Sequence, residues 1–112
     1  MLNARVLRFF GPVLIATGIL GFVLPPSLSL MSGAPAYNLF HIFFGALGAA
    51  LAWRGGNAAC ARFNIAFGAL DLYQLAASFR HWFPWEQIRW TRADDVLHLI
   101  LGLALVALGL IE

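Results

Sequence analysis

The sequence predicts an all-α integral membrane protein with four transmembrane helices, arranged as two tandem hairpins in one compact bundle. Hydrophobic residues make up 62% of the 112 residues, and the mean hydropathy is +0.82. Only 11% of the residues are charged, whereas a soluble domain carries about a quarter. A domain this small cannot hide so much apolar surface from water, so we expect the lipid bilayer to surround most of it.

Long apolar runs define the expected spans at residues 9–24, 38–53, 59–79 and 95–111. A span needs roughly 20 mostly apolar residues. The first run ends at Pro25 and Pro26, because proline cannot continue a helix. The second run ends where an arginine and two glycines occupy residues 54–56.

The arginines set the expected orientation. Arg5 and Arg8 precede the first run, and Arg54 and Arg62 flank the turn after the second run. The first loop, residues 25–37, carries no charge. Because cytoplasmic loops of membrane proteins are enriched in basic residues, we expect both termini and this turn to lie in the cytoplasm.

Residues 80–92 form an expected interfacial loop between the third and fourth runs. Its aromatic and basic residues suit the headgroup layer, where indole rings concentrate and arginines meet lipid phosphates. They are Trp82, Trp85, Trp90, Arg80, Arg89 and Arg92. One interpretation is a segment lying flat on the outer leaflet, with a short helix after Pro84. The other is a docking surface for a neighbouring protein or pigment.

An offset of 57 residues pairs the two halves of the chain, residues 4–55 and 61–112, without a gap. The pattern [Asn/Asp]-x-x-His-x-x-x-Gly recurs at this offset, and further matches accompany it. They are Asn38, His41 and Gly45 with Asp95, His98 and Gly102, then Arg5 with Arg62, Phe10 with Phe67, and Gly11 with Gly68. We therefore predict a duplicated hairpin, with its two copies related by an axis along the membrane normal. The glycines predict close helix packing, because small residues let helix backbones approach in lipid.

Helix capping is the first interpretation of the repeated pattern. Asn38 and Asp95 are favoured residues at a helix N-cap, and His41 and His98 then lie where a side chain bonds back to the cap. Asp94 follows Thr91 at the spacing of a capping box.

A shared cofactor site is the second interpretation. His41 and His98 are expected at equal depth, where two imidazoles can hold a haem iron or the magnesium of a chlorophyll-type pigment. Gly45 and Gly102 would leave room for the face of a porphyrin. A single zinc or copper ion is a further alternative, but no third and fourth ligands follow at tight spacing, so we predict no dedicated metal site.

Asp71 lies near the middle of the third run, where a charged carboxylate is costly. Asn64 and Gln74 fall on the same helix face. An intramembrane acid predicts a functional site, although a neutral, hydrogen-bonded Asp71 joining two helices stays an alternative. Its repeat partner is Leu14, so duplication does not explain it.

The chain resembles a family of small bacterial four-helix membrane proteins of unknown function. The resemblance rests on NLFHIFFG at residues 38–45, on Arg62 with Gly68, and on ADDVLHLILG at residues 93–102. It covers roughly residues 5–111. It implies four spans in a bacterial inner (plasma) membrane and no particular activity.

Three functions follow as expectations. The first is an accessory or scaffold subunit that packs against a larger respiratory or photosynthetic complex, with lipid, other subunits or further copies as partners. The second is a haem- or pigment-binding redox module that uses His41 and His98. The third is a small proton-coupled transporter module centred on Asp71. We predict neither enzymatic activity nor nucleic-acid binding, because no nucleophile–base pair, phosphate loop or basic stripe occurs.

Overall fold

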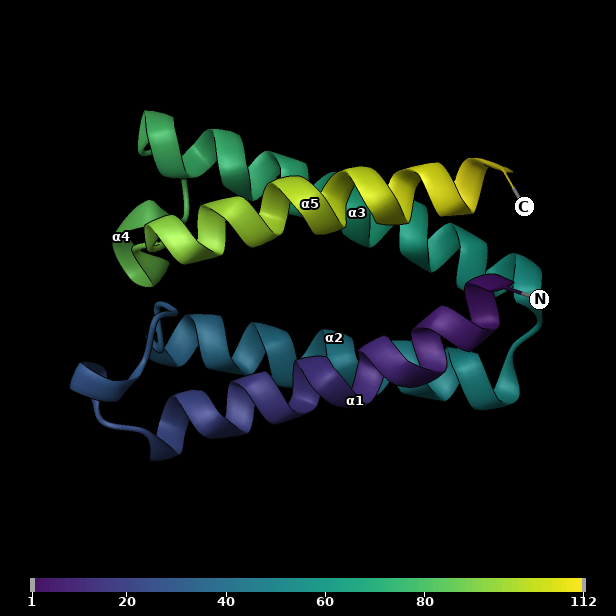
Figure 1. Cartoon of the computed structure of the whole chain (residues 1–112), viewed down its shortest axis with the longest axis horizontal. Helices are drawn as coiled ribbons and strands as arrows, with labels where there is room; N and C mark the ends of the chain where they lie inside the picture. Colours follow the sequence, from purple (N-terminus) through teal and green to yellow (C-terminus); the bar gives the residue numbers. More distant parts are fainter. Residues whose placement is uncertain (1, 112) are drawn as a thin grey trace.

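The computed structural model describes residues 2–111, which fold into helices joined by short connections (Figure 1). The elements are α1 (Leu2–Val23), the 3-10 turn η1 (Pro26–Leu28), α2 (Pro35–Arg54), α3 (Asn57–Arg80), α4 (Trp85–Ile88) and α5 (Arg92–Ile111). No strand occurs in this range, so the all-α class is confirmed. The final residue of the second expected repeat, at position 112, lies outside the described residues.

Three helices are long and apolar enough to cross a membrane. They are α1, α2 and α5, with 22, 20 and 20 residues. The remaining long helix, α3, has 24 residues but a lower hydropathy, because Asn64, Asp71 and Gln74 interrupt its apolar sequence. A membrane protein is therefore supported by three of the four expected spans.

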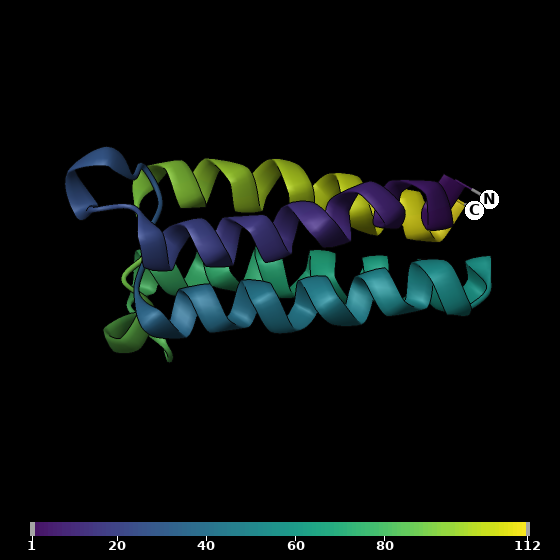
Figure 2. The same cartoon turned by 90° about the horizontal axis from the view of Figure 1, so that it is seen from below.

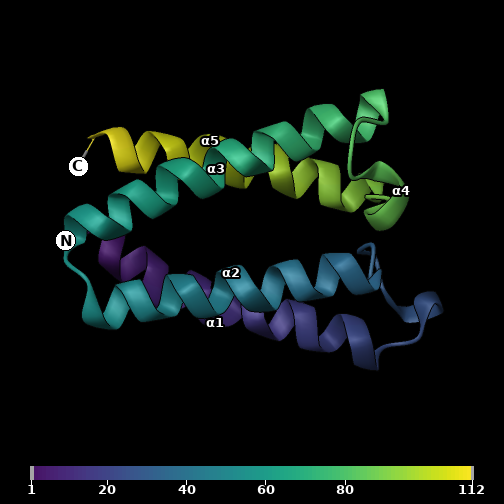
Figure 3. The same ribbon diagram turned by 180° about the vertical axis from the view of Figure 1, so that it is seen from behind.

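The four long helices pack as two pairs. Helix α1 lies along α2, and α3 lies along α5, with fewer contacts between the pairs. Figures 1 and 3 show this arrangement from opposite sides, with α1 and α2 forming one pair and α3 and α5 the other. The molecule measures 39 × 28 × 19 Å, and its long dimension follows the helices.

Glycines bring the helices of each pair into backbone contact. A Cβ atom added to Gly11 would lie 3.0 Å from the carbonyl oxygen of Gly45, and one added to Gly68 would lie 2.9 Å from that of Gly102. The predicted close approach is confirmed. The space beside Gly45 and Gly102 is therefore filled by the neighbouring helix, which corrects the expectation that these glycines leave room for a porphyrin.

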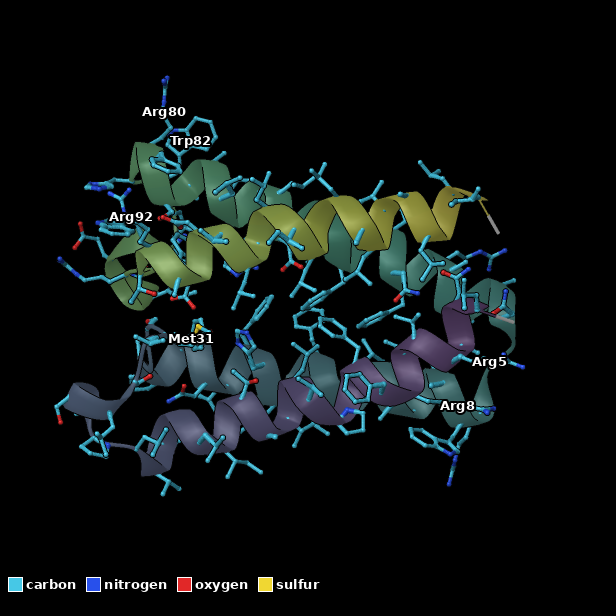
Figure 4. The ribbon with its side chains drawn as sticks, viewed as in Figure 1. Arg5, Arg8, Met31, Arg80, Trp82 and Arg92 are labelled. Carbon is cyan, nitrogen blue, oxygen red and sulfur yellow. The ribbon has the colours of Figure 1, made fainter. Side chains whose placement is uncertain are left out.

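Phenyl rings fill much of the space between the two pairs. Phe10 meets Phe67 edge-on with ring centroids 5.8 Å apart, and Phe63 stacks on Phe67 at 5.5 Å. Figure 4 shows rings gathered in this central region. Phe9, by contrast, is 74% exposed.

Both chain termini lie at one end of the molecule, and the loops that precede α2 and α5 lie at the other (Figure 2). Figure 4 places Arg5 and Arg8 at the terminal end and Arg80 and Arg92 at the loop end. Arginines thus mark both ends of an apolar middle, as expected for helices whose flanks reach lipid headgroups.

Candidate functional site

A capping box begins α5 at the loop end. The backbone N–H of Thr91 donates to Oδ2 of Asp94 at 2.9 Å, and the N–H of Asp94 donates to Oγ1 of Thr91 at 3.2 Å. This reciprocal pair satisfies two backbone donors that the helix itself leaves unpaired. The capping box predicted at Thr91 and Asp94 is confirmed.

Asp94 also joins the first loop and α2 to the pair formed by α3 and α5. The hydroxyl of Tyr37 donates to Oδ1 of Asp94 at 2.8 Å, and the N–H of Ser32 donates to Oδ2 at 2.9 Å. Asp94 is only 1% exposed. Both of its carboxylate oxygens therefore accept hydrogen bonds from the protein, and the contact with Tyr37 was not predicted from the sequence. The signal was present, because Tyr37 precedes Asp94 by the repeat offset of 57 residues.

The capping interpretation is wrong for Asn38 and Asp95. Helix α2 begins at Pro35 after an N-cap at Ala34, which suits the fixed backbone angle of proline in the first turn. Asn38 lies inside that turn, buried, and its Nδ2 donates to the carbonyl of Gly33 at 2.8 Å. Asp95 likewise lies inside α5, after the true cap.

His41 and His98 line one cavity. Nδ1 of His41 lies 2.8 Å from the carbonyl oxygen of Tyr37. Because a carbonyl only accepts, Nδ1 is the donor in this hydrogen bond. His98 is also buried, and its Nδ1 has no hydrogen-bond partner within the described part of the chain.

This cavity has a volume of about 280 Å³ and lies between the two helix pairs. We call it the axial cavity. Its lining comes from α1, the first loop, α2, α3 and α5. Four residue pairs separated by the repeat offset contribute to it, namely Phe10 with Phe67, Leu14 with Asp71, Tyr37 with Asp94, and His41 with His98.

Asp71 is the unusual member of this lining. Its side chain is 2% exposed, and Oδ2 is buried without a hydrogen-bond partner among residues 2–111. Asn64 and Gln74 share its buried face, as predicted. Their hydrogen bonds go elsewhere, to Oδ1 of Asn3 at 2.9 Å and from the indole of Trp90 at 3.0 Å. The structure thus separates Asp71 from the polar bonds that hold helices together.

The expected interfacial loop divides into exposed and buried parts. The short helix after Pro84 is confirmed as α4. Trp82 is 46% exposed beneath the guanidinium of Arg80, and Figure 4 shows both at the outer edge of the loop end. Trp90 is only 4% exposed, because its indole enters the helix packing and donates to Gln74. The expectation that Trp90 lies at the membrane surface is therefore wrong.

The arginines of this loop also differ from one another. Arg89 binds Glu86 at 3.0 Å on the exposed side of the loop and lies over the ring of Trp85. Trp85 in turn stacks on His81 at 4.2 Å. Arg92 begins α5 at the loop end (Figure 4). These contacts hold the loop together, and none of them reaches the axial cavity.

A second cavity, of about 290 Å³, opens at the loop end between α1 and the first loop. We call it the vestibule. It shares Thr17, Met31 and Tyr37 with the axial cavity. Figure 4 shows Met31 between the two helix pairs at the loop end. The vestibule therefore adjoins the axial cavity, and Met31 stands at their boundary.

The space that a porphyrin would need beside Gly45 and Gly102 is taken by the neighbouring helices, because a Cβ added at either glycine would lie within 3.0 Å of them. Sites for drug-sized ligands usually have volumes of about 300–1,000 Å³, and the axial cavity has 280 Å³. The described residues also contain no group of three or more His, Cys, Asp or Glu side chains that could hold a metal ion. Comparison with family models, curated proteins and solved structures finds no match to this chain.

Proposed function

We propose that this chain is a four-span membrane protein built from two tandem hairpins, with α3 as its fourth span. Asn64, Asp71, Gln74 and Ser78 lie on the buried face of α3, so between its end arginines this helix can meet lipid mainly with apolar side chains. The uncharged first loop, the arginines near the N-terminus (Arg5 and Arg8) and those that flank the turn after α2 (Arg54 and Arg62) favour termini in the cytoplasm. The family resemblance favours a bacterial plasma membrane.

Contacts between equivalent residues support a duplicated hairpin with a two-fold axis along the helices. Tyr37 binds Asp94, and Phe10 contacts Phe67. In both contacts a residue of the first repeat meets the residue 57 positions later, which is its equivalent in the second repeat. Equivalent residues of two copies meet in this way where they lie beside the two-fold axis that relates the copies.

A second correspondence relates hydrogen bonds away from the axis. The Nδ2 of Asn3 donates to the carbonyl of Leu108, and the thiol of Cys60 donates to that of Leu51. Exchanging the two repeats converts the first of these bonds into the second. The pattern of contacts therefore has the symmetry expected of two copies of one hairpin.

The function that the site supports best is a small proton-coupled transporter module centred on Asp71. One observation carries this proposal: a carboxylate oxygen is buried in the wall of the axial cavity with no partner in the described chain. An unpaired charge in such a place is costly, so the carboxyl group favours binding a proton or another cation. The accessory-subunit function stays a prediction, since none of the contacts above involves a partner surface.

Proton flux in reconstituted liposomes tests this proposal. A potassium gradient with valinomycin sets the membrane potential, and a trapped pH-sensitive dye reports proton entry. We expect flux above that of protein-free liposomes, and we expect Asp71→Asn to abolish it because an amide cannot exchange a proton at this site. Glu86→Gln is the matched control, because Glu86 is an exposed acid in the loop. Equal flux in wild type and Asp71→Asn would contradict the proposal.

A further inference from the structure

We propose that the axial cavity binds a small monovalent organic cation, an amine or quaternary ammonium, between Asp71 and the phenyl rings of Phe10 and Phe67. This inference rests on the proposed function and names the class of solute that the same site takes. All three residues line the cavity, and the two rings lie in contact with each other.

The charge of the cavity favours a cation. Two acids line it, but the carboxylate of Asp94 already accepts from Tyr37, Ser32 and Thr91. Asp71 is the acid with an unpartnered oxygen, and no arginine is among the residues that line the cavity. His41 and His98 also line it, but within residues 2–111 neither forms a hydrogen bond or an ion pair with Asp71. A ligand with a positive charge supplies the counter-ion that the protein does not, through a charge-assisted contact in a low-dielectric site.

The walls favour an organic cation over a bare metal ion. Phenyl rings attract ammonium groups through the negative face of the ring, and this attraction grows when water is excluded. Much of the remaining lining is apolar, including Leu14, Leu97 and Leu101. Hard metal ions require several oxygen ligands, and the described residues hold no cluster that could supply them. Methyl or methylene groups around a nitrogen suit these walls better.

The size and access of the cavity limit the ligand to a compact molecule. At about 280 Å³ the cavity lies just below the range usual for drug-sized ligands. The vestibule offers a route from the loop end, because both cavities share Met31 at their boundary. The flexible side chain of methionine can change rotamer to admit a ligand. In the wall of the cavity, Phe67 packs against Phe10, Phe40 and Phe63.

Equilibrium dialysis of radiolabelled tetramethylammonium against the purified full-length protein in mild detergent tests the inference. We expect saturable binding that tert-butanol, a compact neutral molecule, does not displace. Asp71→Asn should weaken binding by roughly tenfold or more, the effect of losing one charge-assisted contact. Phe67→Leu should weaken it several-fold, and the loop variant Glu86→Gln should bind like wild type.

Two results would overturn the inference. One is equal binding by wild type and Asp71→Asn. The other is displacement by tert-butanol as effective as that by unlabelled tetramethylammonium, which would show that the cavity selects apolar shape alone. If Asp71→Asn does not fold, as judged by gel filtration and circular dichroism, the competition on the wild-type protein still decides.

The outcome is separable from that of the proposed function. Proton flux that depends on Asp71 without tetramethylammonium binding would refute the organic cation and leave the proton-coupled function standing. Binding that depends on Asp71 without proton flux would support the cation site and refute proton coupling. If neither proton flux nor tetramethylammonium binding depends on Asp71, both proposals for this residue are refuted.

Discussion

Tyr37 donates a hydrogen bond of 2.8 Å to Asp94, the residue that lies 57 positions further along the chain. Both side chains are buried at the loop end, and the bond joins α2 of one helix pair to α5 of the other. In the proposed duplication these are equivalent positions that have become a donor and an acceptor. The contact also uses one oxygen of Asp94, which leaves Asp71 as the acid available to a ligand.

Removing the hydroxyl in Tyr37→Phe should lower the free energy of unfolding by about 1.5–3 kcal/mol. The reason is that a buried carboxylate loses a donor and gains no replacement. Thermal unfolding in detergent measures the change. Tyr73→Phe is the matched control, because the Tyr73 hydroxyl bonds the Phe83 carbonyl at 2.6 Å in an exposed position. A larger loss in the control than in Tyr37→Phe would contradict a stabilising role for the hydrogen bond between Tyr37 and Asp94.

Adding a methyl group in Gly68→Ala should destabilise the protein by about 1–3 kcal/mol, because it forces α3 away from α5. The new Cβ would lie 2.8 Å from a side-chain carbon of Val106 and 2.9 Å from the Gly102 carbonyl oxygen. Gly56→Ala serves as the control, since a Cβ at Gly56 meets nothing within 4 Å. Equal melting temperatures for the two variants would show that the backbones are not in contact.

Asp71→Leu should stabilise the protein while removing its function. This variant places leucine at both equivalent positions, 14 and 71, and eliminates a buried acid that has an unpartnered oxygen. Replacing such a group by an apolar side chain of similar size should raise the unfolding free energy by about 1–3 kcal/mol. Thermal unfolding and the proton-flux assay measure the two effects. A loss of stability would mean that Asp71 has a structural partner.

Trp90 and Trp82 should report different surroundings. In variants that keep only one tryptophan, with phenylalanine at the other three positions, Trp90 should emit at shorter wavelength and resist quenching by aqueous acrylamide. Its indole is 4% exposed and hydrogen-bonded to Gln74, whereas Trp82 is 46% exposed. Similar quenching of the two variants would indicate that Trp90 lies at the surface, as the sequence alone suggested.

The sequence was sufficient to predict the long helices, because hydrophobicity and glycine spacing are local properties. Hydropathy located the long helices to within a few residues at most ends, although α1 begins at Leu2 rather than near residue 9. Arginines in its first turns hid the start of that helix. The 57-residue offset also paired Gly11 with Gly68, and the structure places both in the same kind of backbone contact.

The site required the three-dimensional arrangement. Asn38 and Asp95 share a motif with the histidines, but the chain enters α2 through Pro35 and α5 through Thr91, so neither caps its helix. Gly45 and Gly102 face a neighbouring helix rather than a ligand. Hydrogen bonds between polar side chains depend on contacts between distant segments of the chain. The sequence therefore could not show that Asn64 and Gln74 bond to Asn3 and Trp90 rather than to Asp71.

Moving the acid to the equivalent position of the other repeat tests whether a carboxylate in the axial cavity holds the ligand. In the double variant Leu14→Asp/Asp71→Leu, the carboxylate moves to the equivalent position of the first repeat, which lines the same axial cavity. We predict that this variant binds tetramethylammonium within about tenfold of wild type, while Asp71→Leu alone does not bind. The proposal that a carboxylate in the axial cavity holds the ligand would be contradicted by loss of binding in a folded double variant. It would also be contradicted if the single variant Asp71→Leu still bound tetramethylammonium.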